Sequence, residues 1–277
     1  MQVWDRRPRR SFCAADDEYE PVSTLTVLTL VPNAGDRLTR CLESVAWADE
    51  IFCIVDPATT DGSDEVARRY TDRVVVHEYV NKAAQCNWAL PRITSEWTLV
   101  LDADEWITDA LAKRIRDVIA APEGHGPAGY RIRRESIFFG RLIRGCGWQR
   151  DYNLRLFRTR SSRYQERRVH ALVHVDGQIG RIDQPMMHDT YRSFDEYFAT
   201  FHRFTSWGAQ DLYDRGRRAS LFDLAVRPAS RFIRMFFLQQ GYRDGLHGAV
   251  LCGLGAFSVF MKYARLWDLH RRADPPD

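Results

Sequence analysis

Two carboxylates one residue apart, Asp102 and Asp104, are the residues of this sequence best suited to chemistry. They follow an apolar run at residues 97–101, a pattern typical of a strand buried on both faces. Carboxylates at such a strand end can hold a hard divalent cation, which in turn can neutralise a diphosphate. The alternative is a solvated acidic turn. The segment Asp102-Ala103-Asp104-Glu105 is therefore a candidate metal and diphosphate site.

Polar residues also follow two earlier apolar runs. Asp56 comes directly after residues 51–55, and Asn33 comes shortly after residues 24–31. The carboxylate of Asp56 can accept a hydrogen bond from a base N–H or a ribose hydroxyl. Its alternative role is to cap the local turn, as we expect Asp61 to do.

The elements that must position these residues alternate between strands and helices. Runs at 24–31, 51–55, 73–77 and 97–101 predict strands, and patterns at 64–70 and 82–90 predict helices. We expect Asp36 to cap a further helix whose apolar face includes Leu38 and Leu42. This alternation predicts an α/β fold with a mainly parallel sheet and flanking helices. Because ligands bind at the carboxyl ends of such strands, the polar residues should converge at one edge.

Composition and charge exclude several other classes. The formal net charge of +3 is small, and arginine and aromatic residues show no nucleic-acid-binding pattern. The six cysteines form no CxxC pair, which leaves a zinc ribbon without support and suggests a reducing compartment. The basic N-terminus is not followed by an apolar run, so we do not expect a signal peptide.

The ordered set of motifs resembles family 2 glycosyltransferases. Between residues 24 and 108 the resemblance rests on Asn33, RCLESV (40–45), Asp56, TTDGS (59–63), Gln85 with Asn87, and DADE (102–105). It extends through GWQRDYNLRLFR (147–158), Val169-His170, His188 and KYARLW (262–267). The subgroup that the chain resembles most is that of the small bacterial lipopolysaccharide-core β-glucosyltransferases.

The resemblance implies a GT-A fold and a hexosyltransferase that uses a nucleotide sugar, expected to be a UDP-sugar, with Mn²⁺ or Mg²⁺. Asp56 would contact the base, Asp102 the ribose or the metal, and Asp104 the metal. The donor side would also include Asn33, Gln85, Asn87 and Ala103. His188 would complete the metal shell, unless it is an ordinary hydrogen-bonded structural histidine.

Such enzymes invert the anomeric centre by direct displacement, which requires a general base for the acceptor hydroxyl. Asp151 is the candidate base, and Glu105 and Glu166 are alternatives. The competing role for Asp151 is an ion pair with a neighbouring arginine. The chain departs from the subgroup at Ala34, where an acidic residue is usual, and at Ala171, where the subgroup has Glu after Val-His. His170 and His174 lie four residues apart, but the residues between them do not include the Glu found in the zinc-protease motif, so we expect no zinc there.

We expect a flexible leader at 1–22, a catalytic domain at 23–192 and a helical extension at 193–277. Residues 23–108 would bind the nucleotide and residues 109–192 the acceptor. In the extension, the apolar run 249–261 is short for a membrane crossing, which takes about 20 residues. Arginines interleaved with aromatics at 227–237 instead favour a helix lying on the membrane surface, the alternative being a core-packing or dimerising helix pair.

The predicted function is metal-assisted transfer of a sugar to a hydroxyl of an envelope glycan or lipid-linked acceptor. We expect the enzyme to be cytoplasmic and peripheral on the inner face of the cell membrane. Transfer to a polyprenyl phosphate or to a soluble secondary metabolite is the alternative within enzymes. From another class, the alternative is a nucleotide-sugar-binding protein without turnover. Nucleic acid is not expected as a partner.

Overall fold

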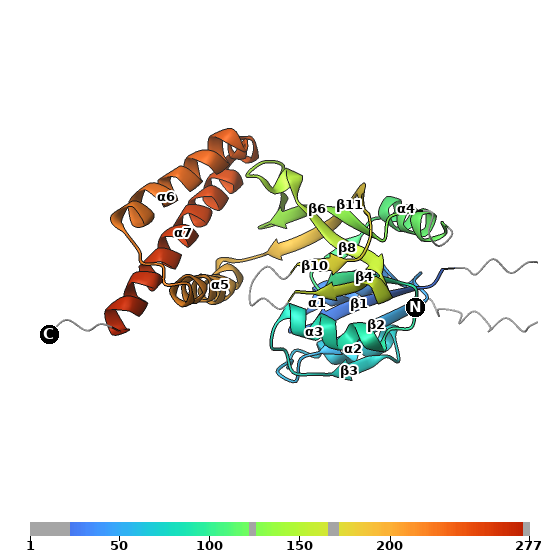
Figure 1. Ribbon diagram of the computed structural model, residues 1–277. Helices are drawn as coiled ribbons and strands as arrows, with labels where there is room; N and C mark the ends of the chain where they lie inside the picture. Colours follow the sequence, from blue (N-terminus) through green and yellow to red (C-terminus); the bar gives the residue numbers. More distant parts are fainter. Residues whose placement is uncertain (1–22, 122–125, 166–171, 274–277) are drawn as a thin grey trace, which may run out of the picture.

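The computed structural model describes residues 23–121, 126–165 and 172–273. The predicted leader, Glu166 and the segment from Val169 to Ala171 lie outside the described residues. A nine-stranded sheet occupies the middle of the described chain, and three helices extend away from it on one side (Figure 1).

The first half of the sheet is parallel. In spatial order its strands are β3 (Val74–Val76), β2 (Glu50–Val55), β1 (Leu25–Val31) and β4 (Trp97–Asp102). All three pairings between these strands are parallel, and each strand coincides with a predicted run. Helices cover both faces of the sheet here. Strands in such a sheet are buried on both sides, and this is why their sequences are continuous apolar runs.

The second half of the sheet is mixed. Its strands are β8 (Tyr152–Arg158), β6 (Gly129–Phe138), β11 (Ile179–Tyr191) and β5 (Glu105–Ile107), with β7 (Arg141–Leu142) paired to β6. β8 is antiparallel to both β4 and β6, whereas β11 is parallel to β6 and antiparallel to β5. A separate ribbon joins β9 (Ser162–Tyr164) to β10 (Val173–Val175). The α/β class is confirmed, with antiparallel pairings confined to the sheet beyond β4.

Helices pack on the two faces of the sheet. These are α1 (Asp36–Glu43), α2 (Ser63–Tyr70), α3 (Lys82–Ala89) and α4 (Asp109–Ile119). Leu25 and Val27 of β1 face the core shared with α1, α2 and α4, whereas Leu28 faces the core shared with α3, as the alternation of a strand requires. The predicted cap at Asp36 is wrong. Gly35 precedes the helix with φ +57°, and Asp36 is its first residue, whose carboxylate accepts a hydrogen bond from Arg192.

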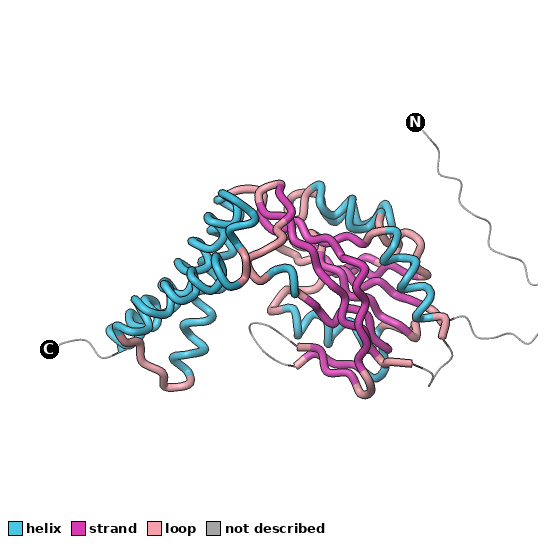
Figure 2. Tube along the Cα trace, turned by 90° about the horizontal axis from the view of Figure 1, so that it is seen from above, coloured by secondary structure: helices cyan, strands magenta, loops and turns pink. Residues whose placement is uncertain are grey.

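Three long helices form the C-terminal part. α5 (Phe194–Asp214) is followed by α6 (Leu221–Ile233), which runs into a π-helical turn, η4 (Arg234–Leu238). A 3₁₀ turn, η5 (Gly241–Asp244), then leads into α7 (Gly245–Ala273). Ser193 and Ser220 cap α5 and α6 through their hydroxyls. Seen from above, α6 and α7 lie together and extend away from the sheet (Figure 2).

A small apolar core fixes this part to the sheet. Phe138, Ile143 and Cys146 pack against Met235 and Cys252. Next to that core, the buried carboxylate of Asp244 accepts hydrogen bonds from the backbone N–H groups of Arg144 (2.8 Å) and Gly145 (2.7 Å). Since charged hydrogen bonds are the stronger ones, the loop after β7 and the start of α7 are held as one unit.

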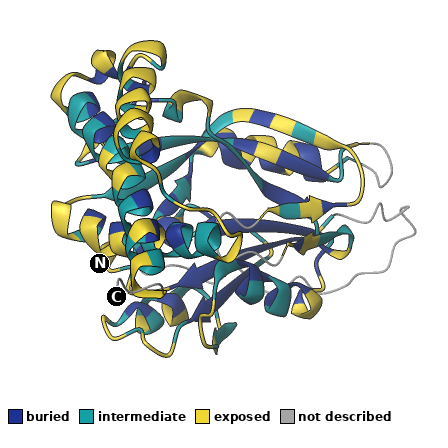
Figure 3. Ribbon diagram, turned by 60° about the vertical axis from the view of Figure 1, so that its left-hand side comes forward, coloured by how far each residue is buried: buried dark blue, intermediate teal, exposed yellow. Residues whose placement is uncertain are grey.

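Much of the surface of the C-terminal helices is exposed (Figure 3), and large apolar side chains are among the exposed residues. They include Leu221, Phe222 and Ile233 of α6, Leu238 after it, and Leu246 of α7. The segment Gly241–Ala273 is also long and apolar enough to cross a membrane, by length and composition alone, with a mean hydropathy of 1.4 over an 18-residue window. The helix is therefore longer than the apolar run 249–261 indicated, and its length alone does not exclude a crossing.

Candidate active site

A cavity of about 620 Å³ opens at the carboxyl ends of the parallel strands. The predicted site residues that line it are Asn33, Asp56, Gln85, Asp102, Ala103, Asp104, Asp151 and His188. Cationic side chains that the sequence did not single out also line it: Arg37, Lys82, Arg134 and Arg203. The expected convergence at one sheet edge is thus observed, and positive charge accompanies the carboxylates.

Asp102 is held by two cations. Its Oδ1 and Oδ2 lie 2.6 and 2.7 Å from Lys82 Nζ, and Oδ2 is also 2.7 Å from Arg155 Nη2. Burial by itself would raise the pKa of Asp102, but the charges of Arg155 and Lys82 outweigh it and hold this pKa well below its ordinary value. Asp102 is therefore an ionised carboxylate with a fixed orientation, and its side chain is still 31% exposed toward the cavity.

Glu105 lies behind this turn and does not line the cavity. Its side chain is fully buried, and its Oε2 accepts a hydrogen bond from the backbone N–H of Asp102 (3.0 Å). Its Oε1 lies 2.6 Å from Arg155 Nη2 and 3.2 Å from Arg134 Nη1. These bonds stabilise the turn from Asp102 to Glu105. They also keep the carboxylate of Glu105 buried, so it cannot contact an acceptor in the cavity.

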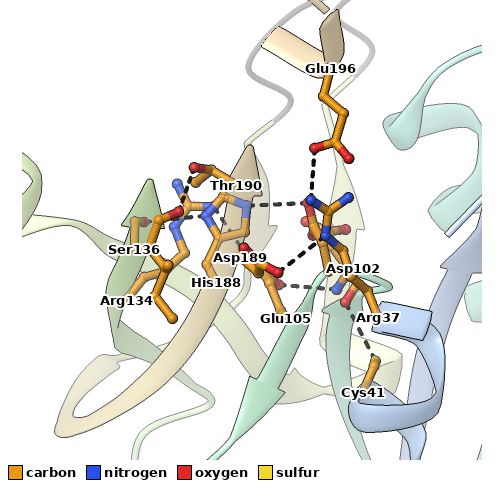
Figure 4. Close-up of polar contacts among 12 residues, drawn as sticks. Arg37, Cys41, Asp102, Glu105, Arg134, Ser136, His188, Asp189, Thr190 and Glu196 are labelled. Atoms are coloured by element: carbon orange, nitrogen blue, oxygen red, sulfur yellow. Dashed lines mark hydrogen bonds and ion pairs between the residues drawn. The ribbon is translucent and has the colours of Figure 1, made fainter. Parts of the chain in front are cut away.

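Asp104 and His188 face each other across the cavity edge, and Figure 4 shows His188 beside Ser136. His188 Nε2 is 3.4 Å from Asp104 Oδ2, and His188 Nδ1 is 3.3 Å from the hydroxyl of Ser136. A partner at Nδ1 fixes the orientation of a ligating imidazole and leaves Nε2 for the metal. The sheet sets this geometry, because β11 pairs with β5 and the N–H of Asp189 donates to the carbonyl of Asp104 (3.0 Å).

These donors suit a cation that shares its shell with substrate. Mg²⁺ and similar ions take one or two protein ligands and fill their remaining positions with water and phosphate oxygens. Asp104 and His188 offer such a pair. Within the described residues, no three His, Cys, Asp or Glu side chains are grouped to hold a metal on their own. Both oxygens of Asp102 already contact Lys82 or Arg155, and its predicted part in the metal shell stays a prediction.

Asp151 lines the cavity and is also ion-paired. Its Oδ2 lies 2.7 Å from Arg134 Nη2, and its Oδ1 accepts a hydrogen bond from Asn153 (3.0 Å). The two roles weighed for Asp151 are thus compatible in space. The ion-pair partner is Arg134 of β6, not an arginine adjacent in sequence.

The remaining predicted donor-side residues differ in position. Asn33 accepts a hydrogen bond from the N–H of Thr60 (2.8 Å), and Asp56 accepts one from the N–H of Ala58 (3.0 Å), so both shape turns while lining the cavity. Gln85 lines the cavity too, with its amide directed to His77. Asn87 is not among the lining residues. Its side chain bonds the backbone N–H and C=O of Tyr164 and anchors β9 instead.

Residues far apart in the chain complete the cavity wall. Arg37 of α1 reaches Asp189 (3.3 Å) and Glu196 (2.7 Å), which ties α1 to β11 and α5. Thr200, Arg203 and Phe204 of α5 line the cavity from the C-terminal part. No local pattern marks these residues, because their positions depend on how α5 packs next to the end of β11.

Comparisons of the sequence with known proteins all find glycosyltransferases. The family model described as Glycosyl transferase family 2 matches residues 26–176. The lipopolysaccharide core biosynthesis glycosyltransferase LpsC of Rhizobium meliloti is 26% identical over 257 residues, covering 90% of this chain and 94% of LpsC. An uncharacterized glycosyltransferase of Rickettsia typhi is 22% identical and covers 88% of this chain and 87% of its own length. Among solved structures, residues 1–349 of S. aureus TarS, in complex with UDP-GlcNAc, align over 91% of this chain and 92% of that one, at a TM-score of 0.47 and 12% identity.

Proposed function

The chain belongs to glycosyl transferase family 2, and from this premise we propose that it transfers a sugar from a UDP-sugar to a hydroxyl of an envelope glycan or lipid-linked acceptor. The proposed reaction inverts the anomeric centre and is assisted by a divalent cation. One observation carries the proposal. Asp104 and His188 face each other in the same cavity that Asp56 lines from the end of β2. A metal-bound diphosphate and a nucleoside can therefore occupy adjoining parts of one cavity.

Asp104 and His188 would hold Mn²⁺ or Mg²⁺, with Ser136 orienting the imidazole. When bound, the cation supplies positive charge against the diphosphate leaving group. Lys82, which touches Asp102, and Arg203 add further positive charge to the cavity. Asp56 and Asp102 would accept hydrogen bonds from the base and the ribose, since ionised carboxylates only accept.

The acceptor side would be formed by Asp151 together with α5. Asp151 would take the proton of the acceptor hydroxyl, and Trp148 lies near it in the cavity wall. Thr200 and Phe204 of α5 give the cavity a wall from the predicted extension 193–277. The similarity to LpsC, a lipopolysaccharide core biosynthesis enzyme, supports a lipopolysaccharide-core saccharide as the acceptor class.

We further propose that the enzyme is cytoplasmic and that α6 and α7 rest on the inner face of the membrane. Exposed apolar side chains support this, among them Leu221, Phe222 and Leu238. Lys262 and Arg265 interrupt α7. A surface-bound helix carries both kinds of residue, because apolar groups enter the acyl region while cations remain at the headgroups. A lipid-linked acceptor would then be presented at the same surface.

The proposal is tested by screening UDP-sugars and other nucleotide sugars for nucleotide release with Mn²⁺ or Mg²⁺, and again after chelation. We expect metal-dependent release from one donor and its loss in Asp104→Ala. Asp176→Ala is the matched control, because it removes an exposed carboxylate on the ribbon of β9 and β10. Release that persists after chelation and in Asp104→Ala would contradict the metal assignment. Donor binding without release or transfer would favour a nucleotide-sugar-binding protein.

A further inference from the structure

A second hollow lies between α6 and α7, apart from the proposed active site. It has a volume of about 540 Å³. Four of its lining residues are cationic: Arg227 and Arg231 of α6, Arg234 of the following π-helical turn, and Lys262 of α7. Spacings of four and three residues place the three arginines on one side of the helix, and Lys262 faces them from the neighbouring helix.

The positive charge of this hollow is largely unbalanced. Asp223 pairs with Arg227 and is also used to cap α6 through Ser220. Within the described residues, no carboxylate forms an ion pair with Arg231, Arg234 or Lys262. Like charges three or four residues apart destabilise a helix, so this arrangement carries a cost that a bound anion would relieve.

The pKa of Lys262 is affected by the same positive charges. Burial, and then the charges of Arg227 and Arg231, lower the pKa of Lys262 from its ordinary value, while Asp223 opposes them. Its stem also lies next to Gly208 of α5. The ammonium group of Lys262 therefore lies in the field of two guanidinium groups, and the carboxylate of Asp223 offsets this field only in part.

The rim of the hollow is apolar and exposed. Ile233 and Leu238 line it, and their side chains are 54% and 77% exposed. Phe237, next to Leu238, is exposed as well. A small anion in water would use the cations and leave these apolar groups without a role. An anionic lipid uses both, because its phosphate meets the cations while its acyl chains meet the apolar rim.

We propose that the hollow between α6 and α7 binds the phosphate group of an anionic membrane lipid, with Arg231, Arg234 and Lys262 as the donors. Arginine suits this role because its planar fork can donate two parallel hydrogen bonds to phosphate oxygens. The site rests on the proposed membrane association and gives it a specific anchor. The pair of α6 and α7, which extends away from the sheet (Figure 2), would then lie against the bilayer.

The test uses the full chain and vesicle flotation. Partition is measured on vesicles of phosphatidylcholine alone and on vesicles that also contain phosphatidylglycerol. The variant is Arg231→Gln with Arg234→Gln. The matched control is Arg68→Gln with Arg69→Gln, which removes the same charge from two exposed positions of α2, a helix that lies on the sheet and apart from α6 and α7 (Figure 1). We expect the first pair to lose on the order of 30-fold in partition to anionic vesicles, from the contribution of each cation near an anionic surface, and the control to keep the wild-type value.

Equal partition of the two double variants would overturn the lipid-phosphate site, as would equal binding of the wild type to neutral and anionic vesicles. Wild type that floats with neither vesicle would overturn both the site and the membrane association. Binding of inorganic phosphate, measured at constant ionic strength, tests whether the hollow instead binds free phosphate. If the Arg231/Arg234 variant loses only the binding of inorganic phosphate and partitions normally, the lipid assignment is wrong. Nucleotide release is followed on the same preparations, so failure of the proposed transfer activity is recognised separately from failure of this site.

Discussion

The guanidinium of Arg155 and the carboxylate of Glu105 form a buried ion pair, with Nη2 and Oε1 2.6 Å apart. The same nitrogen lies 2.7 Å from Oδ2 of Asp102. One arginine of β8 therefore joins both carboxylates at the ends of the turn that contains Asp104. Because Glu105 also accepts a hydrogen bond from the N–H of Asp102, the turn is fixed from behind before any substrate arrives.

Replacing Arg155 should destabilise the whole fold. Arg155→Met leaves the buried Glu105 carboxylate, among the residues that the structure describes, with Arg134 at 3.2 Å as its one cationic partner. Removing one member of a buried pair costs about 3 kcal/mol or more, and we expect a loss of about that size in the free energy of unfolding. Urea denaturation measures it. Arg181→Met, which breaks an exposed pair with Asp183, should leave the midpoint unchanged; similar losses in both variants would show that the buried pair is not special.

The ionisation of Asp102 gives a pH prediction with a definite sign. Its pKa is held well below the ordinary 3.8, so the stability that its charge contributes is complete above that ordinary value and is lost only as the pH falls below it. The difference in unfolding free energy between wild type and Asp102→Asn should therefore stay constant from about pH 8 to about pH 5. Urea denaturation of both proteins across this range measures it. A difference that shrinks steadily between those limits would mean that Lys82 and Arg155 do not hold the carboxylate as described.

The sequence was sufficient to predict the α/β GT-A fold, which is confirmed, and the elements of its parallel half. Buried parallel strands such as β1 and β4 need uninterrupted apolar runs, and helices such as α2 need a one-sided pattern, so the chain carries both signals locally. The cap assigned to Asp36 was wrong because Gly35, with its positive φ, makes the turn into α1. Asp36 pairs with Arg192 instead, a contact that only the tertiary fold creates.

Residues of the candidate site could be predicted from the sequence only where a polar side chain directly follows a buried strand. Asn33, Asp56, Asp102 and Asp104 follow buried runs, so their convergence could be argued from topology alone. The sequence around Arg134 does not mark it as a site residue, since an arginine on a strand with both polar and apolar residues is usually exposed to solvent. Its role depends on the pairing of β6 with β8, which brings it to Asp151. The same holds for α5, whose contribution to the cavity depends on packing that no local pattern encodes.

The imidazole of His188 should depend on Ser136 for metal affinity. Ser136→Ala removes the partner of His188 Nδ1, and loss of such an orienting group usually weakens metal binding about 10- to 100-fold. His188→Ala should weaken it further. Nucleotide release titrated with Mn²⁺, together with calorimetry in the presence of UDP, measures both effects. His174→Ala, on the exposed ribbon strand β10, is the control. Unchanged Mn²⁺ dependence in His188→Ala would remove His188 from the metal shell.

Asp151→Asn tests the proposed general base. The amide keeps the size of the side chain, but it cannot take a proton, so kcat should fall about a hundred- to ten-thousandfold while donor binding stays near the wild-type value. Asp183→Asn changes an exposed carboxylate and should leave both unchanged. Full turnover by Asp151→Asn would point to an acceptor that is already charged, such as a polyprenyl phosphate, because a phosphate nucleophile needs no strong base.

Arg203 of α5 should contribute to donor binding. It lines the cavity, and its guanidinium lies 5.5 and 5.6 Å from the ring centroids of Phe204 and Trp207. Within the described residues it forms no ion pair with a carboxylate, so its charge is available to the diphosphate. A charged hydrogen bond contributes about 1.5 kcal/mol or more, so Arg203→Gln should raise the donor KM about tenfold. Arg215→Gln, at the exposed end of α5, is the matched control. If both variants keep the wild-type KM, α5 closes the cavity without binding the donor, and its role is confined to the acceptor side.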